Sequence, residues 1–357
     1  MDVRILGPSG LRVSRLCLGT ATFGNADWGC DTAESDRILG RYLELGGNFL
    51  DTANKYADGN SETTLGRILA GRRDQIVLGT KFTATMNDAD PNSAGNHRKN
   101  LTASLNASLR RLRTEYVDVL WVHAWDGVTP IDELMRALDD QIRAGKVLSA
   151  GISNAPSWMV AHANAAAGVR GSSPLCAVQS EYSLLERGAE RELLPMCGYL
   201  GLAFLAWAPI AQGRLTGKYP RDGKGQGRLT PDEARMPARR HAIVAETVAV
   251  AAELGCSPAT VALTWILRHR PEAIPVIGAR TLGQLEANLA CLGQALPADH
   301  LARLTAISAG EAGSPAAFLR SAAGRDFMWG GAATVPPRLT QAAEPWWEHV
   351  TLAEPHQ

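Results

Sequence analysis

Short apolar runs alternate with helix-forming patterns along most of this chain, from about residue 16 to residue 292. Eight such runs occur, and helical apolar spacing follows them. Strands that are almost entirely apolar are typical of a parallel sheet that is covered by helices. Eight strand–helix units therefore predict an α/β fold of the (β/α)8 TIM-barrel type, in which the sheet closes on itself.

The boundaries of these units follow from turn residues and helix-start residues. The expected strands cover residues 16–19, 48–51, 76–81, 116–123, 147–152, 177–181, 203–207 and 274–277. The expected helices cover residues 32–45, 61–70, 98–112, 131–144, 156–167, 190–199, 240–254, 258–269, 281–291 and 297–308. Ser61 is expected to cap the second of these helices. Before the first unit, the turn sequence GPSG at 7–10 predicts an N-terminal β-hairpin over the bottom of the barrel.

Two segments lie outside this alternation. Residues 220–240 contain a basic, glycine-rich loop, and residues 309–357 are rich in Ala, Gly and Pro, which predicts an irregular, loop-rich C-terminal extension. The whole chain, 1–357, is expected to form a single barrel domain. A doubly wound sheet is the alternative, but neither a strand–GxGxxG–helix sequence nor GxxxxGK[ST] occurs.

Charge and cysteine content exclude several classes of protein. The 36 basic residues balance the 36 acidic ones, so we expect no binding to nucleic acid and none to a membrane surface. The six cysteines stand apart without a CxxC pair, which predicts neither a zinc site nor a disulfide framework and favours a reducing cytoplasm. No apolar signal core and no run of about 18 apolar residues is present.

Polar side chains stand at the exits of three consecutive expected strands. Asp51 ends the second strand and Tyr56 follows it, Lys81 ends the third, and His123 ends the fourth. Each residue alone has an ordinary explanation as a turn cap, a solvated strand end or a loop aromatic. Because a barrel gathers the carboxyl ends of its strands at one rim, together these residues predict a single pocket.

These residues also match a known pattern. The sequence FLDTANKY at 49–56, followed by GNSE at 59–62, resembles the signature of the aldo-keto reductase superfamily. Asp51, Tyr56, Lys81 and His123 match the Asp–Tyr–Lys–His tetrad of that family. Residues 104–118, 145–154, 207–218 and 278–288 are similar to its later motifs, so that the resemblance extends from about residue 3 to residue 292. Residues 119–126 and the loop 91–98 are most similar to the aryl-alcohol dehydrogenase-type branch.

The resemblance implies that a carbonyl compound is reduced to an alcohol, which requires a hydride for carbon and a proton for oxygen. Tyr56 is the expected general acid, because a tyrosine hydroxyl holds its proton at neutral pH and can donate it to a developing alkoxide. Lys81 is expected to favour the phenolate, with Asp51 keeping the lysine charged and oriented. His123 is expected to hydrogen-bond the carbonyl oxygen. No metal is required.

The cofactor that the resemblance implies is NADPH/NADP+. Trp207 offers an aromatic face to a nicotinamide ring, and Ser153, Asn154 and Gln179 suit its carboxamide. Lys218 and the helix that begins near Thr281 suit phosphate. The motif that contains Arg280 resembles the contact with the 2′-phosphate, which favours NADP(H) over NAD(H). The remaining residues of that motif are Gly278, Gln284 and Asn288.

The substrate is expected to be a small-molecule carbonyl compound. Trp28 and Trp125 follow the first and fourth strands and are candidates for the pocket wall, as are residues 309–330. These aromatic residues favour an aromatic or apolar aldehyde or ketone, with a sugar or a natural-product ketone as alternatives. The alternative to an enzyme is a barrel that binds NADPH as a regulatory or sensing subunit. The sequence sets no oligomeric state.

Overall fold

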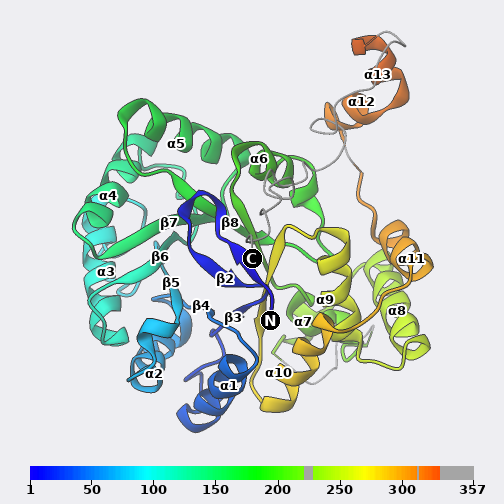
Figure 1. The fold of residues 1–357 in the computed structure, drawn as a ribbon, viewed down its shortest axis with the longest axis horizontal. Coiled ribbons are helices and arrows are strands. Elements are labelled where there is room, and N and C mark those ends of the chain that lie inside the picture. The colour runs from blue at the N-terminus through cyan, green and yellow to red at the C-terminus, as the bar shows by residue number, and fades with distance from the viewer. Residues whose placement is uncertain (221–227, 312, 330–357) are drawn as a thin grey trace, which may run out of the picture.

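A closed eight-stranded parallel barrel forms the centre of the molecule, which confirms the predicted (β/α)8 architecture (Figure 1). The computed structural model describes residues 1–220, 228–311 and 313–329. The strand order around the barrel is β10-β3-β4-β5-β6-β7-β8-β9, so each strand pairs with its neighbour in the sequence and the last strand pairs with the first. The barrel strands are β3 (Cys17–Gly19), β4 (Phe49–Asp51), β5 (Val77–Phe82), β6 (Val117–Val122), β7 (Val147–Ser153), β8 (Leu175–Glu181), β9 (Ala203–Trp207) and β10 (Ala273–Gly278).

Helices surround the barrel on its outer side (Figure 1). The helices of the described chain are α1 (Thr32–Glu44), α2 (Asn60–Ile68), α3 (Arg98–Leu112), α4 (Ile131–Arg143), α5 (Ser157–Arg170), α6 (Leu193–Leu200), α7 (Pro231–Ala234), α8 (Ala238–Glu253), α9 (Pro258–His269), α10 (Leu282–Leu289), α11 (Ala298–Ser308), α12 (Ala316–Arg320) and α13 (Ala322–Trp329). The largest cluster of buried apolar residues lies between these helices and the outward-facing side chains of the strands. Because the strands are buried on both faces, their sequences are apolar throughout rather than alternating.

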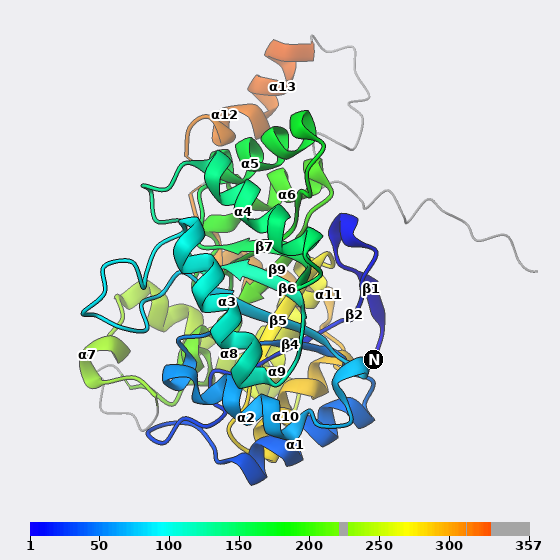
Figure 2. The ribbon, with the colours of Figure 1, turned by 90° about the vertical axis from the view of Figure 1, so that its left-hand side faces the viewer.

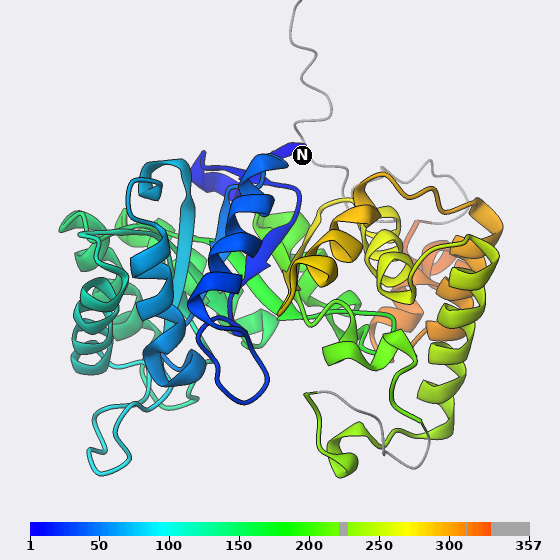
Figure 3. The ribbon, with the colours of Figure 1, turned by 90° about the horizontal axis from the view of Figure 1, so that it is seen from below.

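The inside of the barrel is a second, smaller apolar core. It contains inward-facing side chains from seven barrel strands and two residues from the N-terminal hairpin, Leu6 and Val13. The hairpin strands β1 (Val3–Ile5) and β2 (Arg12–Ser14) pair antiparallel, as predicted. They lie at one end of the barrel, while α7 and the long loops after the strands lie toward the opposite end (Figures 2 and 3). The barrel is therefore closed at its bottom, which leaves only the rim at the strand carboxyl ends for a site.

Two local predictions were wrong. Gly59, in the left-handed conformation with φ 89°, precedes α2, so the helix begins at Asn60 and Ser61 lies inside its first turn. The Ser61 hydroxyl instead donates to the carbonyl of Thr20 at 2.7 Å and contacts the hydroxyl of Thr52 at 2.9 Å. Ser61 therefore ties α2 to the ends of β3 and β4 rather than capping a helix.

The second correction concerns the C-terminal extension. Of residues 309–357, the described part contains the short helices α12 and α13, where irregular structure was expected. The sequence 316–329 is rich in Ala and other helix-forming residues, and this local propensity outweighs the glycine and proline content of the segment as a whole. The prediction for residues 330–357 falls outside the described residues.

No single helix in the described ranges has both the length and the apolar composition for a membrane span. The pair α8 and α9 meets that criterion only when the two helices are taken together, and they meet at a bend of 99°.

Candidate active site

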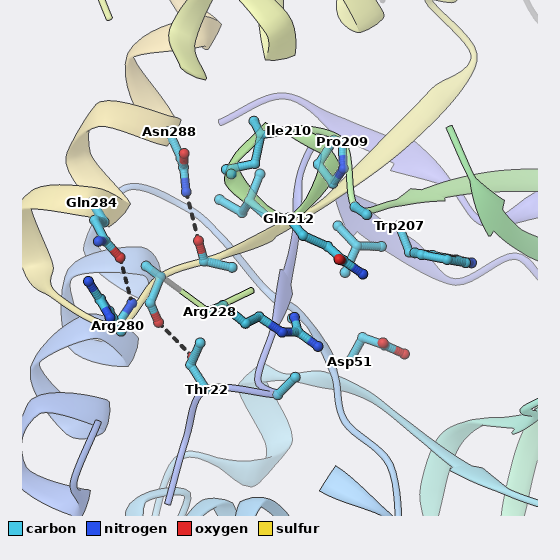
Figure 4. Close-up of a pocket in the computed structure, with 18 of the residues that line it drawn as sticks. Thr22, Asp51, Trp207, Pro209, Ile210, Gln212, Arg228, Arg280, Gln284 and Asn288 are labelled. Carbon is cyan, nitrogen blue, oxygen red and sulfur yellow. Dashed lines mark hydrogen bonds between the residues drawn. The ribbon is translucent and has the colours of Figure 1, made fainter. Parts of the chain in front are cut away.

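A cavity of about 460 Å³ opens at the carboxyl ends of the barrel strands. Its lining includes almost every predicted site residue (Figure 4). The predicted residues that line the cavity are Trp28, Asp51, Tyr56, His123, Ser153, Asn154, Gln179, Trp207, Lys218, Gly278, Arg280, Gln284 and Asn288. Residues that are up to 260 positions apart in sequence thus share one cavity, because the barrel brings the ends of all its strands to one rim.

Lys81 is the centre of the charged cluster below this cavity. Its ammonium donates to Oδ2 of Asp51, to the carbonyl oxygen of Thr52 at 2.9 Å and to the hydroxyl of Tyr56 at 3.1 Å. Lys81 and Asp51 are each only 1% exposed. An ammonium group has three N–H donors, so these contacts use all of them. The lysine is thus held in one orientation, with a single N–H aimed at the tyrosine.

Strand register produces this cluster. Asp51 on β4 pairs with Gly79 on β5, and Lys81 lies two residues further along the same strand. Because side chains alternate between the two faces of a strand, residues 79 and 81 face the same side, which is the barrel interior. The carboxylate and the ammonium therefore meet inside the rim.

The backbone after Tyr56 is in an unusual conformation. Ala57 and Asp58 both have left-handed backbone angles, with φ 50° and 49°, and Gly59 follows with φ 89°. Non-glycine residues rarely adopt this region, and such strain concentrates at functional sites. The turn leads directly into α2, which fixes the position of Tyr56 at the cavity wall.

Burial and charge act in opposite directions on the ion pair. Burial raises the pKa of Asp51 above its usual value. Lys81, and to a smaller extent Gln179, stabilise the carboxylate and lower this pKa, but burial outweighs them. Burial also opposes the charge on Lys81, but Asp51 and Tyr56 outweigh it, so the net effect is a raised pKa of Lys81. The lysine therefore keeps its charge at neutral pH.

His123 lies beside Tyr56 with its ring edge-on, 5.8 Å between ring centroids. Its backbone N–H donates to the carbonyl of Phe82 and to the hydroxyl of Thr83, both at 3.2 Å, and its carbonyl accepts from the Asn154 side chain at 2.9 Å. Burial, with a smaller contribution from the positive charge of Lys81, lowers the pKa of His123 to about 3. At neutral pH this imidazole is uncharged and has one N–H to donate.

The depressed pKa of His123 predicts a specific acid sensitivity. An unfolded chain binds a proton at this histidine below about pH 6.5, whereas the folded chain does so only near the lower pKa. The protein should therefore lose stability as pH falls through this window. Between pH 7 and pH 4.5, the free energy of unfolding should decrease in both proteins. We expect the decrease to be about 2 kcal/mol smaller for His123→Gln than for the wild type. Urea unfolding at the two pH values measures this difference.

The exposed His162 on α5 provides the matched control. His162→Gln should follow the wild-type pH dependence. If His123→Gln does the same, the neutral, buried state of His123 is wrong.

Amide side chains and a tryptophan lie on the other side of the cavity. The indole N–H of Trp207 donates to Oδ1 of Asn154 at 3.3 Å, and Asn154 itself has a left-handed backbone, with φ 49°. Gln179 is buried, and its Nε2 has no hydrogen-bond partner among the described residues. A buried amide donor without a partner at a cavity wall is suited to a ligand that supplies the missing acceptor.

Cationic and loop residues fill the remaining end of the cavity. Arg280 lies in the short loop between β10 and α10, and its backbone N–H donates to the side chain of Gln284 at 3.0 Å. Asn288 donates to the carbonyl of Gly278 at 3.0 Å, so that two polar side chains of α10 shape the loop (Figure 4). Thr281 caps α10 through its side chain, and the helix begins beside it, close to the expected position.

Several cavity residues escaped sequence reasoning. Thr22 donates to the carbonyl of Ala279 at 2.6 Å and joins the first and last strand loops. Arg228 lies over the ring of Trp28 at 4.1 Å from the ring centroid and lines the cavity. Arg228 belongs to the basic, glycine-rich loop that the composition singled out, and its charge was the available signal. Nothing in the sequence indicated that this loop reaches the segment after β3.

Two of the suggested substrate contacts need correction. Trp125 is not among the cavity-lining residues, because its ring packs edge-on against Trp158 with 5.1 Å between centroids. Residues 309–330 were also expected near the cavity, but no residue of the described part, 309–311 and 313–329, lines it. In Figure 1, α12 and α13 lie at the outer edge of the molecule, beyond α6 and α11.

Comparison with known proteins agrees with this geometry. Residues 15–309 match the model of the aldo/keto reductase family. The chain is 39% identical over 330 residues to a norsolorinic acid reductase of Emericella nidulans, covering 88% of this chain and 84% of the relative. An aryl-alcohol dehydrogenase of Pestalotiopsis microspora is 38% identical over 307 residues, covering 83% and 79%. A putative aryl-alcohol dehydrogenase of Saccharomyces cerevisiae is 32% identical over 334 residues, covering 88% of both chains.

The chain therefore belongs to the aldo/keto reductase family, and the resemblance seen in its motifs is confirmed. It is an oxidoreductase that acts on carbonyl compounds.

Proposed function

We propose that this protein is an NADPH-dependent carbonyl reductase that reduces an aldehyde or ketone to an alcohol. The observation that carries the proposal is the Lys81 ammonium, fixed between a buried carboxylate and the hydroxyl of Tyr56 at the cavity wall. This arrangement aims a positive charge at a hydroxyl that can serve a substrate as proton donor. His123 stands beside it as a neutral hydrogen-bond donor.

The four residues divide the work of protonating the carbonyl oxygen. The N–H of His123 binds and orients that oxygen. Tyr56 gives its proton to the oxygen as negative charge develops there, and the adjacent ammonium of Lys81 stabilises the phenolate that remains. Asp51 keeps Lys81 charged and fixed. His123, Tyr56 and Lys81 act on charge that develops during the reaction, which is where an enzyme gains rate.

The cavity residues fit NADPH, which supplies the hydride when bound. Trp207 offers an aromatic face, and the unpaired Nε2 of Gln179 would hold the nicotinamide carboxamide together with Ser153 and Asn154. Lys218, Arg228 and Arg280 line the cavity as three cations. Such a set suits the negative charges of a dinucleotide phosphate, and a guanidinium suits the 2′-phosphate in particular.

Arg280→Ala tests the choice of cofactor. The variant should bind NADPH about 10- to 100-fold more weakly, because a charge-assisted contact with the 2′-phosphate is lost. Its affinity for NADH, which lacks that phosphate, should remain within a few-fold of wild type. Titration by tryptophan fluorescence measures both constants, with the exposed Arg268→Ala as the control. An equal loss for the two cofactors would show that Arg280 does not read the 2′-phosphate.

The substrate class that we propose is an aromatic aldehyde or ketone. Trp28, Tyr56, His123 and Trp207 present aromatic rings to the cavity, and such rings stack on planar substrates. The name of one compared relative, aryl-alcohol dehydrogenase, supports the same class.

Oxidation of NADPH in the presence of aromatic aldehydes such as 4-nitrobenzaldehyde tests the proposed function directly. Turnover with tight NADPH binding is the expected result. Tight binding without turnover across a broad panel of aldehydes and ketones would favour a regulatory, cofactor-binding barrel. Failure to bind NADPH would contradict the cofactor assignment.

A further inference from the structure

One oxygen of the buried Asp51 carboxylate has no partner among the described residues. Oδ2 accepts from Lys81, but Oδ1 is buried without a hydrogen bond. Lys81 cannot serve both oxygens, because its three N–H groups already go to Asp51, Thr52 and Tyr56. A carboxylate oxygen that is buried without a donor costs free energy, so a second donor is needed to keep Asp51 ionised.

A donor without an acceptor lies nearby, inside the barrel. Trp121 on β6 is fully buried, and its indole Nε1 has no hydrogen-bond partner among the described residues. Gly79 lies between the two orphaned atoms. A Cβ on Gly79 would stand 2.6 Å from Nε1 of Trp121 and 3.6 Å from Oδ1 of Asp51. The unpaired indole donor and the unpaired carboxylate acceptor therefore both lie beside Gly79, where the indole leaves no room for a side chain.

The barrel is built to hold the indole in this place. Trp121 pairs with Lys81 on one neighbouring strand and with Gly151 on the other. A Cβ on Gly151 would stand 2.4 Å from the far ring of the indole, so that only glycine fits there. With glycine on both sides, the indole fits inside the barrel with its N–H edge beside Gly79 and its six-membered ring beside Gly151. No part of the proton route described above makes use of Trp121.

We propose that Trp121 is a positioning residue, whose indole N–H stabilises the charge on Oδ1 of Asp51 across Gly79. The indole N–H is a fixed dipole beside a buried carboxylate, and such a dipole favours the charged form of the acid. Trp121 acts on the reaction through Asp51, then Lys81, then Tyr56. This role rests on the proposed function of those three residues.

The other charged and titratable groups around Asp51 do not supply this contact. Lys81 on β5 is fully engaged, and Tyr56 and His123 approach the lysine rather than Oδ1. Cys17 on β3 is buried, and burial followed by the charge of Asp51 raises the pKa of its thiol, so it stays neutral. Gln179 on β8 also favours the charged form of Asp51, but its Nε2 makes no hydrogen bond of normal geometry and so does not replace the missing donor.

Trp121→Phe tests the proposal, since it removes the N–H and keeps an aromatic ring. Trp265→Phe is the matched control. Trp265 is equally buried, but its N–H donates at 3.0 Å to the hydroxyl of Thr305, far in sequence from the charged cluster. Both variants lose packing and one indole N–H, and only the first removes a donor that serves a carboxylate.

The first readout is the free energy of unfolding in urea, measured without cofactor from pH 8 downward. A donor to the ionised carboxylate contributes only while Asp51 is charged. The stability deficit of Trp121→Phe should therefore shrink as pH falls through the pKa of Asp51, with its midpoint about one pH unit above that of the wild type. The deficit of Trp265→Phe should not follow the titration of Asp51. A deficit of Trp121→Phe that does not change through the pKa of Asp51 would overturn the proposal.

The second readout is turnover. At pH 7, Trp121→Phe should lower kcat about tenfold with little change in KM, because Asp51 and Lys81 act in the chemical step rather than in substrate binding. Unchanged kcat with active wild-type enzyme would contradict the positioning role. If the wild type itself does not turn over and the pH-dependent deficit persists, the proposed function fails while the contact between Trp121 and Asp51 stands.

Gly79→Ala keeps the inference testable if Trp121→Phe does not fold. The added methyl group would occupy the space between the two atoms and displace the indole N–H without removing it. The same pH-dependent deficit is expected. Gly283→Ala, at a helical glycine with open space around its Cβ position, is the control.

Discussion

Replacing Tyr56 with phenylalanine is expected to lower the rate of carbonyl reduction by about 10³-fold or more. The change removes only the hydroxyl oxygen, which lies 3.1 Å from the ammonium of Lys81. Without it, we expect none of the described residues at the cavity wall to replace it fully as proton donor, because His123 is neutral and Lys81 is buried. NADPH binding should be retained, since the cationic end of the cavity is untouched.

Single-turnover oxidation of NADPH with a saturating aromatic aldehyde measures this effect on the chemical step. Tyr199→Phe is the control, because Tyr199 is 88% exposed on the surface of α6. A rate for Tyr56→Phe within a few-fold of the wild type would eliminate Tyr56 as the proton donor. It would leave His123 as the next candidate to be tested.

The second large effect is expected at the buried ion pair. Lys81→Met should destabilise the protein by about 3–5 kcal/mol, because it leaves the carboxylate of Asp51 buried without its partner. It should also abolish turnover, since no charge remains to stabilise the phenolate. Without Lys81 the pKa of Asp51 rises further, so the stability deficit should be largest near neutral pH and shrink in acid, where Asp51 is protonated.

The double variant Asp51→Asn/Lys81→Met separates charge from packing. Removing both charges should recover most of the stability lost in the single variant, because no buried charge is left unpaired. Urea unfolding at pH 7 and pH 5 measures both deficits, and the double variant should show little difference between them. A single variant as stable as the wild type would mean that water reaches Asp51, and that the pair is less isolated than its 1% exposure indicates.

Together these variants test whether the site residues act in series. In that series Trp121 acts on Asp51, Asp51 acts on Lys81, and Lys81 acts on Tyr56. The further a residue lies from the substrate in this series, the smaller the expected effect of its substitution on the rate. Its effect on the free energy of unfolding should become correspondingly more important. Tyr56→Phe should affect rate almost alone, Lys81→Met both, and Trp121→Phe mainly the pH dependence of unfolding.

Much of the fold followed from local patterns in the sequence. The strands and helices lie within a few residues of their expected positions, and α3, Arg98–Leu112, begins and ends at the predicted residues. Buried parallel strands require apolar runs, and helices that cover a barrel require an apolar stripe, so both leave a periodic signal. The errors fell where a signal spans one or two residues, as at Ser61, or where propensity and composition disagree, as in α12 and α13.

The sequence by itself determined the class of protein. The barrel architecture follows from the eight apolar runs, and the position of Asp51, Tyr56, Lys81 and His123 at the strand exits follows from the order of residues along those runs. These are properties of single segments. Because side chains alternate between the two faces of a strand, the position of a residue in the segment determines which way its side chain points. The family likewise followed from short motifs in the correct order.

Only the tertiary structure decided which side chains face one another across strands. It turned Trp125 away from the cavity and placed Arg228 over Trp28. It also set the indole of Trp121 between two glycines that are 72 positions apart, beside the unpaired oxygen of Asp51. Such contacts depend on barrel closure and on the volume that each neighbouring side chain leaves free. The periodicity of a single segment predicts neither of these.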